Sequence, residues 1–382
     1  MLRIHPTLRR CWRDVGRVQL GADPAHAQVL DGLTAGDEAL LDDLVDGVAE
    51  ADLAARAATR GVPAGAAVHL VGLLATAGAL EPPSAPGARA AARATAAEAR
   101  TQALVRGAGG WDVLARRGQR RVVVEGSGRV PAAVGAGLVE AGVGRVEHHA
   151  PGGSGAPDLR RHARTAGSPP HGPRRSGRSG AEAVRSAAGS AGAPRGATED
   201  GAADLVVLVV DAAAPPTRGA QLLRADADHL AVVLRERSAV VGPLVVPGRS
   251  ACLRCLDLHR TDRDPEWPRV AAQLAHPATV EAPPDVVLLR LTAALAVAQV
   301  LAHLDALAVP ARTAGVLPDG SAGPAAPGHE LAPPWGAPEP PSATAGTAAA
   351  QGRTWELSLP DGLPVGREWP PHPACGCTWP PP

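Results

Sequence analysis

The sequence predicts an α/β protein in two parts: a larger part with a mixed sheet, and a small α+β module before it. Short runs of β-branched residues alternate with helical patterns from about residue 120 onward, as at Arg121–Glu125 and Asp204–Asp211. Residues 1–82 combine one short alternating segment, Arg17–Leu20, with three stretches of helical spacing. A glycine-rich turn after the first buried run makes the larger part Rossmann-like, and the single strand with three short helices makes the module winged-helix-like.

Composition narrows the class of protein. The chain has 382 residues, enough for two domains with linkers, and its formal net charge of zero gives no general case for nucleic-acid binding. No apolar run approaches a membrane span, and the first twelve residues lack a signal-peptide core, so we expect a cytoplasmic protein with no membrane or nucleic-acid partner. The chain contains no Lys, Tyr or Phe, so Arg must supply any positive charge at a site.

The first module, residues 1–82, carries recognisable helix signals. Thr34 and Asp37 are candidate caps for a helix that bears Leu40, Leu41, Leu44 and Val48. A second helix is expected over 52–59. A third is expected over 64–77, with Val68, Val71 and Leu74 on its buried face. Two interpretations stay open: a structural cap on the next domain, or a peptide-binding module whose sheet edge takes an extended peptide as an added strand.

The rest of the chain divides into three further stretches. Residues 83–109 are expected to form a linker that becomes a helix. Residues 110–310 form the Rossmann-like domain, interrupted by a low-complexity insert at 151–200 that we expect to be disordered. Residues 311–382 are expected to form a loop to about residue 350, then a strand at 354–359 and a cysteine-containing tail.

The opening of the Rossmann-like domain resembles a phosphate-binding turn. Gly126, Gly128 and Arg129 follow the first buried strand, and a helix is expected over 132–141 with the next strand at 144–147. Glycines at such a turn let a phosphate approach the N–H groups of a helix N-terminus. However, Pro131 replaces the third glycine, and His148 with His149 stand where an acidic ribose ligand is expected. A nucleotide site and a Rossmann-like fold without nucleotide therefore both remain open.

The second half of this domain is predicted from strong apolar patterns. A buried strand ends at Asp211, a helix covers 218–225, and strands cover 229–234 and 239–246 as a hairpin continuation. One long helix over 283–304 should bury one side, formed by Val286, Leu289, Ala293, Val297, Val300 and Leu304.

Four of the five cysteines occur as two close pairs. Cys252 and Cys255 follow the turn Pro247-Gly248, and Cys375 with Cys377 lie near the C-terminus. Two such pairs are what a tetrahedral thiolate zinc site needs, so we predict one structural Zn²⁺ on these four residues. His372 is expected to hydrogen-bond next to this site, and the remaining Cys11 is expected to be packed rather than reactive.

A charged segment follows the first cysteine pair. His259 with Asp257, Asp262 and Asp264 suggests either an acid–base cluster or a loop of ion pairs with neighbouring arginines, and we favour the loop.

The combination of VGPLVVPGRSACLRCLDLHRTDRDPEWP with a terminal HPACGC resembles the ThiF/MoeB/HesA superfamily, whose folds are like those of ubiquitin-activating enzymes. It is most similar to the branch of cyclodehydratase partners in thiazole/oxazole-modified peptide pathways. The resemblance implies that the N-terminal module binds the leader of a precursor peptide. It also implies that the ThiF-like part is a scaffold and that a separate YcaO-type enzyme carries the ATP chemistry. ThiF-like domains commonly pair, so the long apolar helix is a candidate homodimer interface as well as a core helix.

This sequence departs from that of an adenylating member of the superfamily at the residues expected to bind the nucleotide and its metal. Asp211 is the strand-end acid, but Ala214 falls where the resemblance places the magnesium ligand, so ATP and Mg²⁺ are doubtful. The sequence thus favours a peptide-binding, zinc-containing scaffold. The alternative is an ATP-dependent adenylyltransferase acting on a peptide or carrier-protein C-terminus, with Gly126, Gly128, Arg129 and Asp211 as its nucleotide residues. A third interpretation is a dimeric ThiF-fold protein without a ligand.

Overall fold

The computed structural model describes residues 1–22, 27–81, 96–106, 110–149, 202–275, 285–307, 330–332 and 350–378. The chain divides into two compact units, Met1–Ala115 with Ala311–Thr344, and Arg116–Pro310 with Ala345–Pro382. The insert predicted at 151–200 lies outside the described residues, as do 83–95 and 107–109 of the predicted linker.

Unit 1 contains an antiparallel sheet in the order β1-β2-β3-β9. Its strands are β1 (Arg10–Asp14), β2 (Arg17–Leu20), β3 (Gln28–Asp31) and β9 (Glu330–Ala332). The sequence predicted β2 alone. The prediction of a loop up to about residue 350 is wrong at β9. This strand is defined by its pairing with the distant β3 and has no alternating sequence pattern by which it could be predicted.

The helices of unit 1 follow the predicted order: α1 (Ala35–Asp46), the 3₁₀ turn η1 (Glu50–Asp52), α2 (Leu53–Thr59), α3 (Ala64–Thr76) and α4 (Ala96–Arg106). The predicted cap of α1 is confirmed. The Asp37 backbone N–H donates to Thr34 Oγ1 at 3.2 Å, and the Thr34 N–H donates to Asp37 Oδ2 at 2.8 Å. The buried face of α3 carries Ala67, Leu70 and Leu74, whereas Val68 is 64 % exposed, so the predicted face was only partly right.

Unit 2 is built on a mixed sheet in the order β11-β10-β8-β7-β6-β4-β5. The four strands from β5 to β7 are parallel and the others pair antiparallel, which confirms the predicted mixed sheet. The strands are β4 (Arg121–Glu125), β5 (Arg145–His149), β6 (Leu205–Asp211), β7 (His229–Leu234), β8 (Ser238–Val245), β10 (Arg353–Ser358) and β11 (Pro364–Glu368).

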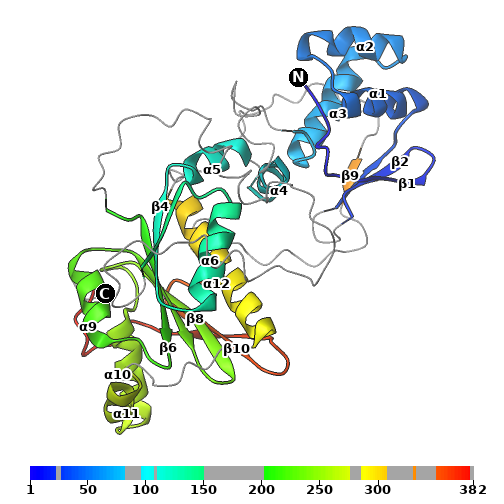
Figure 1. Ribbon diagram of the computed structural model, residues 1–382. Helices are drawn as coiled ribbons and strands as arrows, with labels where there is room; N and C mark the ends of the chain where they lie inside the picture. The colour runs from blue at the N-terminus through cyan, green and yellow to red at the C-terminus, as the bar shows by residue number, and fades with distance from the viewer. Residues whose placement is uncertain are drawn as a thin grey trace, which may run out of the picture. The chain divides into compact units, whose positions relative to one another are not determined.

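Helices cover both faces of this sheet. On one face, α6 (Arg129–Glu140) and α12 (Val286–Ala306) bury Val134, Leu138 and Val300 against β4, β6 and β7 (Figure 1). On the other face, α9 (Pro216–Arg224) and α10 (Leu253–Arg263) pack against β6, β7 and β8. The remaining helices of the described chain are α5 (Gly110–Arg117) and α11 (Trp267–Leu274).

The long helix α12 forms the predicted core helix. Leu289, Ala293, Val300 and Leu304 are buried as expected, but Val286 is 53 % exposed because it begins the helix beyond the sheet. Its 21 residues and mean hydropathy of 1.8 also meet the length and composition of a membrane span, which corrects the expectation that no run approaches one. Its buried side packs on the sheet within the main core of unit 2, as a core helix does.

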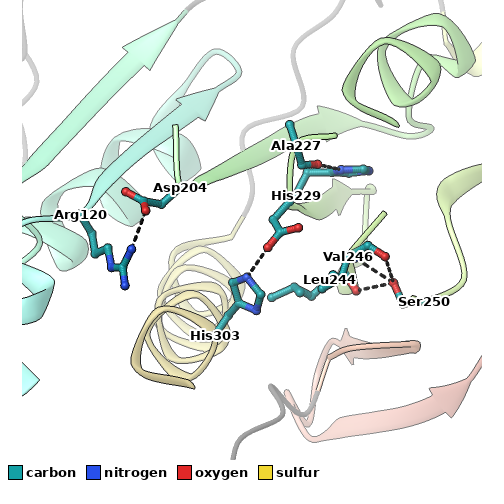
Figure 2. A network of polar contacts seen from close by, with 9 residues as sticks. Arg120, Asp204, Ala227, His229, Leu244, Val246, Ser250 and His303 are labelled. Carbon is teal, nitrogen blue, oxygen red and sulfur yellow. Dashed lines mark hydrogen bonds and ion pairs between the residues drawn. The ribbon is translucent and has the colours of Figure 1, made fainter. Parts of the chain in front are cut away.

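Polar contacts order the amino-terminal edge of the sheet (Figure 2). Arg120 bonds Asp204 at 2.8 Å where β4 and β6 begin, and His303 of α12 lies 2.7 Å from Asp228, just before β7. The first residue of β7, His229, donates Nδ1–H to the Ala227 carbonyl at 2.8 Å. Burial lowers the pKa of the His229 imidazole, more than its carbonyl contact raises it, so the neutral ring is favoured in the fold.

A buried ion pair in unit 2 lies where α5 and α12 end. Arg117, the last residue of α5, donates to both carboxylate oxygens of Asp305 in the last turn of α12, at 2.8 and 2.7 Å. Both side chains are only 2 % exposed. A pair this deeply buried costs much desolvation, so its fully bonded geometry is required for stability.

We therefore expect Arg117→Met to destabilise unit 2 by about 3–5 kcal/mol, because it leaves the Asp305 carboxylate buried without its partner. The double variant R117M/D305L should recover much of that loss, and Arg145→Met, which removes an exposed pair with Glu147, should cost at most about 1 kcal/mol. Urea unfolding of the three variants measures this. Equal losses for Arg117→Met and Arg145→Met would contradict the assignment.

Candidate functional site

The residues predicted for nucleotide binding lie at one edge of the unit 2 sheet. β4 lies between β5 and β6, so the chain runs from β4 to one side and then returns to the other. Open parallel sheets bind ligands at the carboxyl ends of their strands, where the strand order reverses in this way. The structure brings Gly126 and Gly128, just after β4, to the same edge as Asp211, the last residue of β6.

The glycine turn has the predicted backbone. Gly126 has φ 142°, and a Cβ there would lie 2.5 Å from the Val209 carbonyl oxygen, so no larger residue fits between β4 and β6. Gly128, with φ 91°, is the N-cap of α6, and Arg129 is its exposed first residue. Because α6 starts three residues earlier than predicted, Pro131 falls in its first turn. The turn thus has one N–H fewer to offer a phosphate.

An ion pair that the sequence did not predict lies at this edge. Arg218 of α9 donates Nε–H to Glu125 Oε2 at 2.7 Å and bonds the other carboxylate oxygen through Nη2. The hydrogen bond to Glu125 raises the pKa of the guanidinium. Glu125 directly precedes Gly126, so this ion pair lies beside the glycine turn. The charges of Glu125 and Arg218 neutralise each other there. The signal in the sequence was the carboxylate that ends a run of valines; its partner is 93 residues away.

The position of the expected ribose acid is occupied by His148, near the end of β5. Its Nε2–H donates to the Gly126 carbonyl at 2.8 Å, since a carbonyl oxygen only accepts. The imidazole thus binds the turn itself rather than a ribose hydroxyl.

The position of the expected magnesium ligand is apolar. Ala214 packs against the cluster that includes Leu253 and Leu256 of α10, and Ala212 adopts φ 59° to bring the chain there. Asp211 is exposed at the end of β6 and belongs to no group of metal-ligand side chains within the described part of the chain. A cavity between this loop, β7, β8 and α10 has a volume of about 20 Å³, which is room for a water rather than for a nucleotide.

The four paired cysteines meet on the opposite face of the sheet from α12. The sulfur of Cys252 lies 3.8 Å from that of Cys255 and 3.5 Å from that of Cys375, and the Cys255 and Cys377 sulfurs are 3.3 Å apart. All four sulfurs lie within 4.8 Å of one another. A tetrahedral metal with bonds of about 2.3 Å to sulfur needs sulfurs about 3.8 Å apart, so this donor set fits such an ion. It does not contain disulfides, whose sulfurs are bonded at about 2.05 Å.

Local structure explains how the first pair is presented. After β8, a turn closes with the Arg249 N–H donating to the Val246 carbonyl at 3.0 Å. Pro247 and Gly248 occupy its centre, and Gly248 has the positive φ of 72° that the second central residue of such a turn requires. Cys252 then caps α10, and Cys255 follows in the first turn of the same helix, so both sulfurs face one point.

The C-terminal tail reaches this point through several contacts. The buried Trp369 donates its indole N–H to Thr354 Oγ1 at 2.9 Å. His259 of α10 bonds the Pro370 carbonyl at 2.9 Å, and the His372 backbone N–H donates to Cys255 Sγ at 3.3 Å. The tail is therefore held in place just before the second cysteine pair, and His259 and Cys255 of α10 provide two of these contacts.

The thiols are electrostatically coupled. A hydrogen bond from the Cys252 thiol lowers the pKa of Cys255 to about 4, and the same bond raises the pKa of Cys252 far above its usual range. Burial raises the pKa of Cys375 to about 11. Without a metal, the first thiol to ionise gives a stable thiolate, and the raised pKa values of Cys252 and Cys375 oppose the loss of further protons. Only a bound cation stabilises four negatively charged sulfurs together.

Two predictions about neighbouring residues need correction. The segment from Asp257 to Asp264 is not a loop: all of it except Asp264 lies in α10, which begins directly after Cys252. One predicted ion pair is present, between Arg260 and Asp257 at 3.3 Å, and burial raises the pKa of this carboxyl. Cys11, expected to be packed, is exposed on the edge strand β1.

His259, Asp262 and His372 also place ligand-type atoms within 4.8 Å of one another. His372 Nδ1 accepts from the Ala374 N–H at 3.1 Å, so the neutral ring carries its proton on Nε2 and donates it to Asp262 at 2.9 Å. His259 likewise donates Nε2–H to a carbonyl. Both ε nitrogens are engaged as donors, so in this arrangement the two histidines anchor the tail.

Comparison with solved structures identifies the fold. The heterocyclase TruD matches with a TM-score of 0.60 at 15 % identity, over 99 % of this chain and 42 % of that chain. A heterocyclase in complex with substrate and cofactor matches with a TM-score of 0.58 at 15 % identity, over 99 % and 39 %. MccB of E. coli, solved with AMPCPP and MccA, matches with a TM-score of 0.57 at 13 % identity, over 99 % of both chains.

The chain thus spans about two fifths of the heterocyclase chains and nearly all of MccB. No family model matches it, and the search of curated proteins found no match. The architecture predicted from the sequence, a Rossmann-like domain with a mixed sheet after a small α+β module, is confirmed, and MccB and TruD share this fold.

From the carboxyl edge we expect weak or no binding of ATP·Mg²⁺. Ala214 and His148 stand where carboxylates are expected to contact Mg²⁺ and the ribose, and each such contact is worth about 1.5–3 kcal/mol. The loss of both contacts weakens the affinity for ATP·Mg²⁺ by roughly a hundredfold or more. Isothermal titration measures this, with MccB, which has been solved with ATP, as the positive control.

Pyrophosphate exchange is the stricter measurement. We expect no exchange of pyrophosphate into ATP, with or without a peptide. Exchange that depends on a peptide and is abolished by Asp211→Ala would mean that the edge is an adenylation site.

Proposed function

We propose that this protein is a scaffold that binds a precursor peptide and supports a YcaO-type enzyme, which forms azolines from Cys, Ser or Thr. The observation that carries the proposal is that two features occur in one chain. A small module with an antiparallel sheet precedes a ThiF-type domain whose nucleotide edge is filled by its own ion pair, Arg218 with Glu125. Such a chain retains the means to bind a peptide but not the groups that orient ATP.

The solved structures of the same fold support a peptide partner. One heterocyclase is in complex with its substrate, and MccB is in complex with N-formylated MccA. We propose that a separate YcaO-type partner forms the heterocycles, as the resemblance of the sequence to cyclodehydratase partner proteins implies. We propose that a homodimer forms through the exposed side chains of Val286, Val287 and Leu291 on α12. We also propose that the protein is cytoplasmic, because thiols stay reduced in that compartment.

A second candidate function is adenylyl transfer to a peptide C-terminus. The observation that favours it is the turn from Gly126 to Gly128, whose backbone still leads into the N-terminus of α6. The paired Glu125 and Arg218 and the apolar Ala214 disfavour it.

We also propose that Cys252, Cys255, Cys375 and Cys377 hold one Zn²⁺ with a structural role. Four sulfurs complete a tetrahedral shell and leave no position open for a substrate, as is usual for structural zinc. When bound, the metal would supply cross-linking of the tail to α10, and no step of the chemistry would pass through it. The backbone N–H of His372, which donates to Cys255 Sγ, would stabilise the thiolate charge.

The zinc proposal predicts about one Zn²⁺ per chain in protein purified under reducing conditions. Cys377→Ser should lose the metal and destabilise the tail by several kcal/mol, because metal binding energy is partly folding energy. Metal analysis and thermal unfolding provide the measurement. Cys11→Ser, which changes an exposed cysteine in the other unit, is the matched control and should behave as wild type. Wild-type protein without zinc would refute the proposal.

The scaffold proposal predicts that a YcaO-type enzyme encoded beside this gene modifies the neighbouring precursor peptide only when this chain is present. Mass spectrometry detects each azoline as the loss of one water. A leaderless core peptide should remain unmodified. Asp211→Ala should retain full support of the partner, since no nucleotide binds at that edge. Loss of support in Asp211→Ala, or equal modification without this chain, would contradict the proposal.

A further inference from the structure

We propose that β9 is an internal strand that occupies the edge of β3 and competes with an incoming peptide for it. The inference rests on the proposed function, in which this chain binds a precursor peptide, and on the interpretation that the peptide adds as a strand to the sheet of the N-terminal module. It goes further, because it identifies the edge, the competitor within the chain and the kind of peptide that replaces it.

The register defines the occupied edge. β9 pairs antiparallel with β3, with Ala332 opposite Val29, Leu331 opposite Leu30 and Glu330 opposite Asp31. β3 would otherwise be an edge strand of the sheet, since its other neighbour is β2. The segment 330–332 therefore stands where an extended peptide would add to the sheet.

The opposite edge is less suited to a peptide. Its strand β1 has an irregular register between Trp12 and Asp14, and an irregularity of this kind ends regular pairing. Four of its five residues are exposed, so a strand added there would lie away from the core of the module. In β3, by contrast, Val29 and Leu30 are buried and the strand is regular.

The pairing of β9 is short and weakened by its sequence. It comprises three residues. Pro333 and Pro334 follow it directly and carry no backbone N–H to extend the ladder. The register also sets Glu330 opposite Asp31, and two acids directly opposite each other disfavour a strand pair. β9 is therefore a strand that a better partner can displace.

The residues of β3 indicate what a better partner contains. Asp31 forms an ion pair with Arg17 of β2 and has a pKa lowered by that hydrogen bond, so it is ionised at neutral pH. A peptide of five or more residues can form a longer ladder than β9, and a basic or neutral residue at the position opposite Asp31 avoids a register that sets two acids opposite each other. Apolar or β-branched residues opposite Val29 and Leu30 would favour the strand further.

Covalent connection makes even a weak internal strand an effective competitor. A tethered segment acts at a local concentration near the millimolar range, and the apparent affinity of a competing peptide falls by the fraction of chains in which the edge is free. The protein would therefore reject peptides that pair no better than its own segment and accept those that do.

The test uses full-length protein and a probe taken from the chain itself. The variant E330P/L331P/A332P removes every N–H of β9, whichever of them face β3. The probe is a fluorescein-labelled synthetic peptide with the sequence of residues 326–336 and the change Glu330→Lys. The same peptide with Leu331→Pro is the control. We expect the probe to bind the variant roughly tenfold or more tightly than wild type, measured by fluorescence anisotropy.

Hydrogen exchange provides the second readout. The amides of β3 should exchange faster in the variant than in wild type and become protected again when the probe is added. Equal affinity for the two proteins, absence of probe binding to the variant, or unchanged exchange in β3 would each overturn the inference.

A second variant locks the edge instead of opening it. Asp31→Cys with Glu330→Cys, made in a Cys11→Ser protein, sets two cysteines directly opposite each other across β3 and β9. The oxidised form should bind neither the probe nor the precursor, and reduction should restore binding. Binding of the probe to the locked form at the affinity of the reduced form would overturn the inference.

The precursor peptide distinguishes this inference from the proposed function. If the probe behaves as expected but the precursor binds neither wild type nor the opened variant, the proposed function fails and the internal strand stands. If the precursor binds wild type and the opened variant equally, the proposed function stands and the competition is wrong.

Discussion

The meeting of four cysteine sulfurs is the interaction on which the C-terminal part of unit 2 depends. Beyond β11, the tail buries one large apolar side chain, Trp369, and is otherwise half-buried or exposed as far as residue 378. So little apolar surface cannot offset the entropy of ordering the tail. The sulfur cluster and the hydrogen bonds of His259 and His372 supply what is missing, and they do so on the face of the sheet that α12 does not cover. A metal there would act on stability rather than on chemistry.

The carboxyl edge of the sheet illustrates why a fold and a site are separate properties. A catalytic site keeps its charges available for the substrate, but here the guanidinium of Arg218 and the carboxylate of Glu125 satisfy each other, and His148 satisfies the Gly126 carbonyl. The glycine turn itself is present, including Gly126 with φ 142°. The side chains around this turn decide whether it can serve a substrate, because function depends on the site rather than on the fold.

The module at the N-terminus presents a different constraint. A small sheet must manage two edges, each with unpaired backbone groups. The irregular, exposed β1 ends pairing on one side, and on the other side the chain supplies a strand of its own, which returns from the C-terminal part of the sequence to pair with β3. This arrangement keeps the sheet paired, and the edge of β3 becomes free when a peptide displaces β9.

Local chemistry in the sequence was sufficient to predict much of this protein. The valines of β4 and β6, the capping pair Thr34 and Asp37 and the Pro247-Gly248 turn each act over a few residues, and the structure has them as expected. The cysteines are the one long-range case: the close spacing within each pair predicted which four sulfurs converge, although Cys252 and Cys375 are 123 residues apart.

Only the tertiary structure decided the features made by residues far apart in the chain. The pairing of β9 with β3, the bond between Arg218 and Glu125, and the buried contact of Arg117 with Asp305 each join segments whose sequences carry no sign of the partner. A charged residue or a three-residue strand is compatible with many surroundings, and burial and register select one of them only after the sheet has formed. The sequence by itself therefore determined the fold class and the sulfur cluster. The ion pair of Glu125 with Arg218 at the carboxyl edge and the occupied edge of β3 were decided by packing, because both depend on which distant side chains and strands the fold brings together.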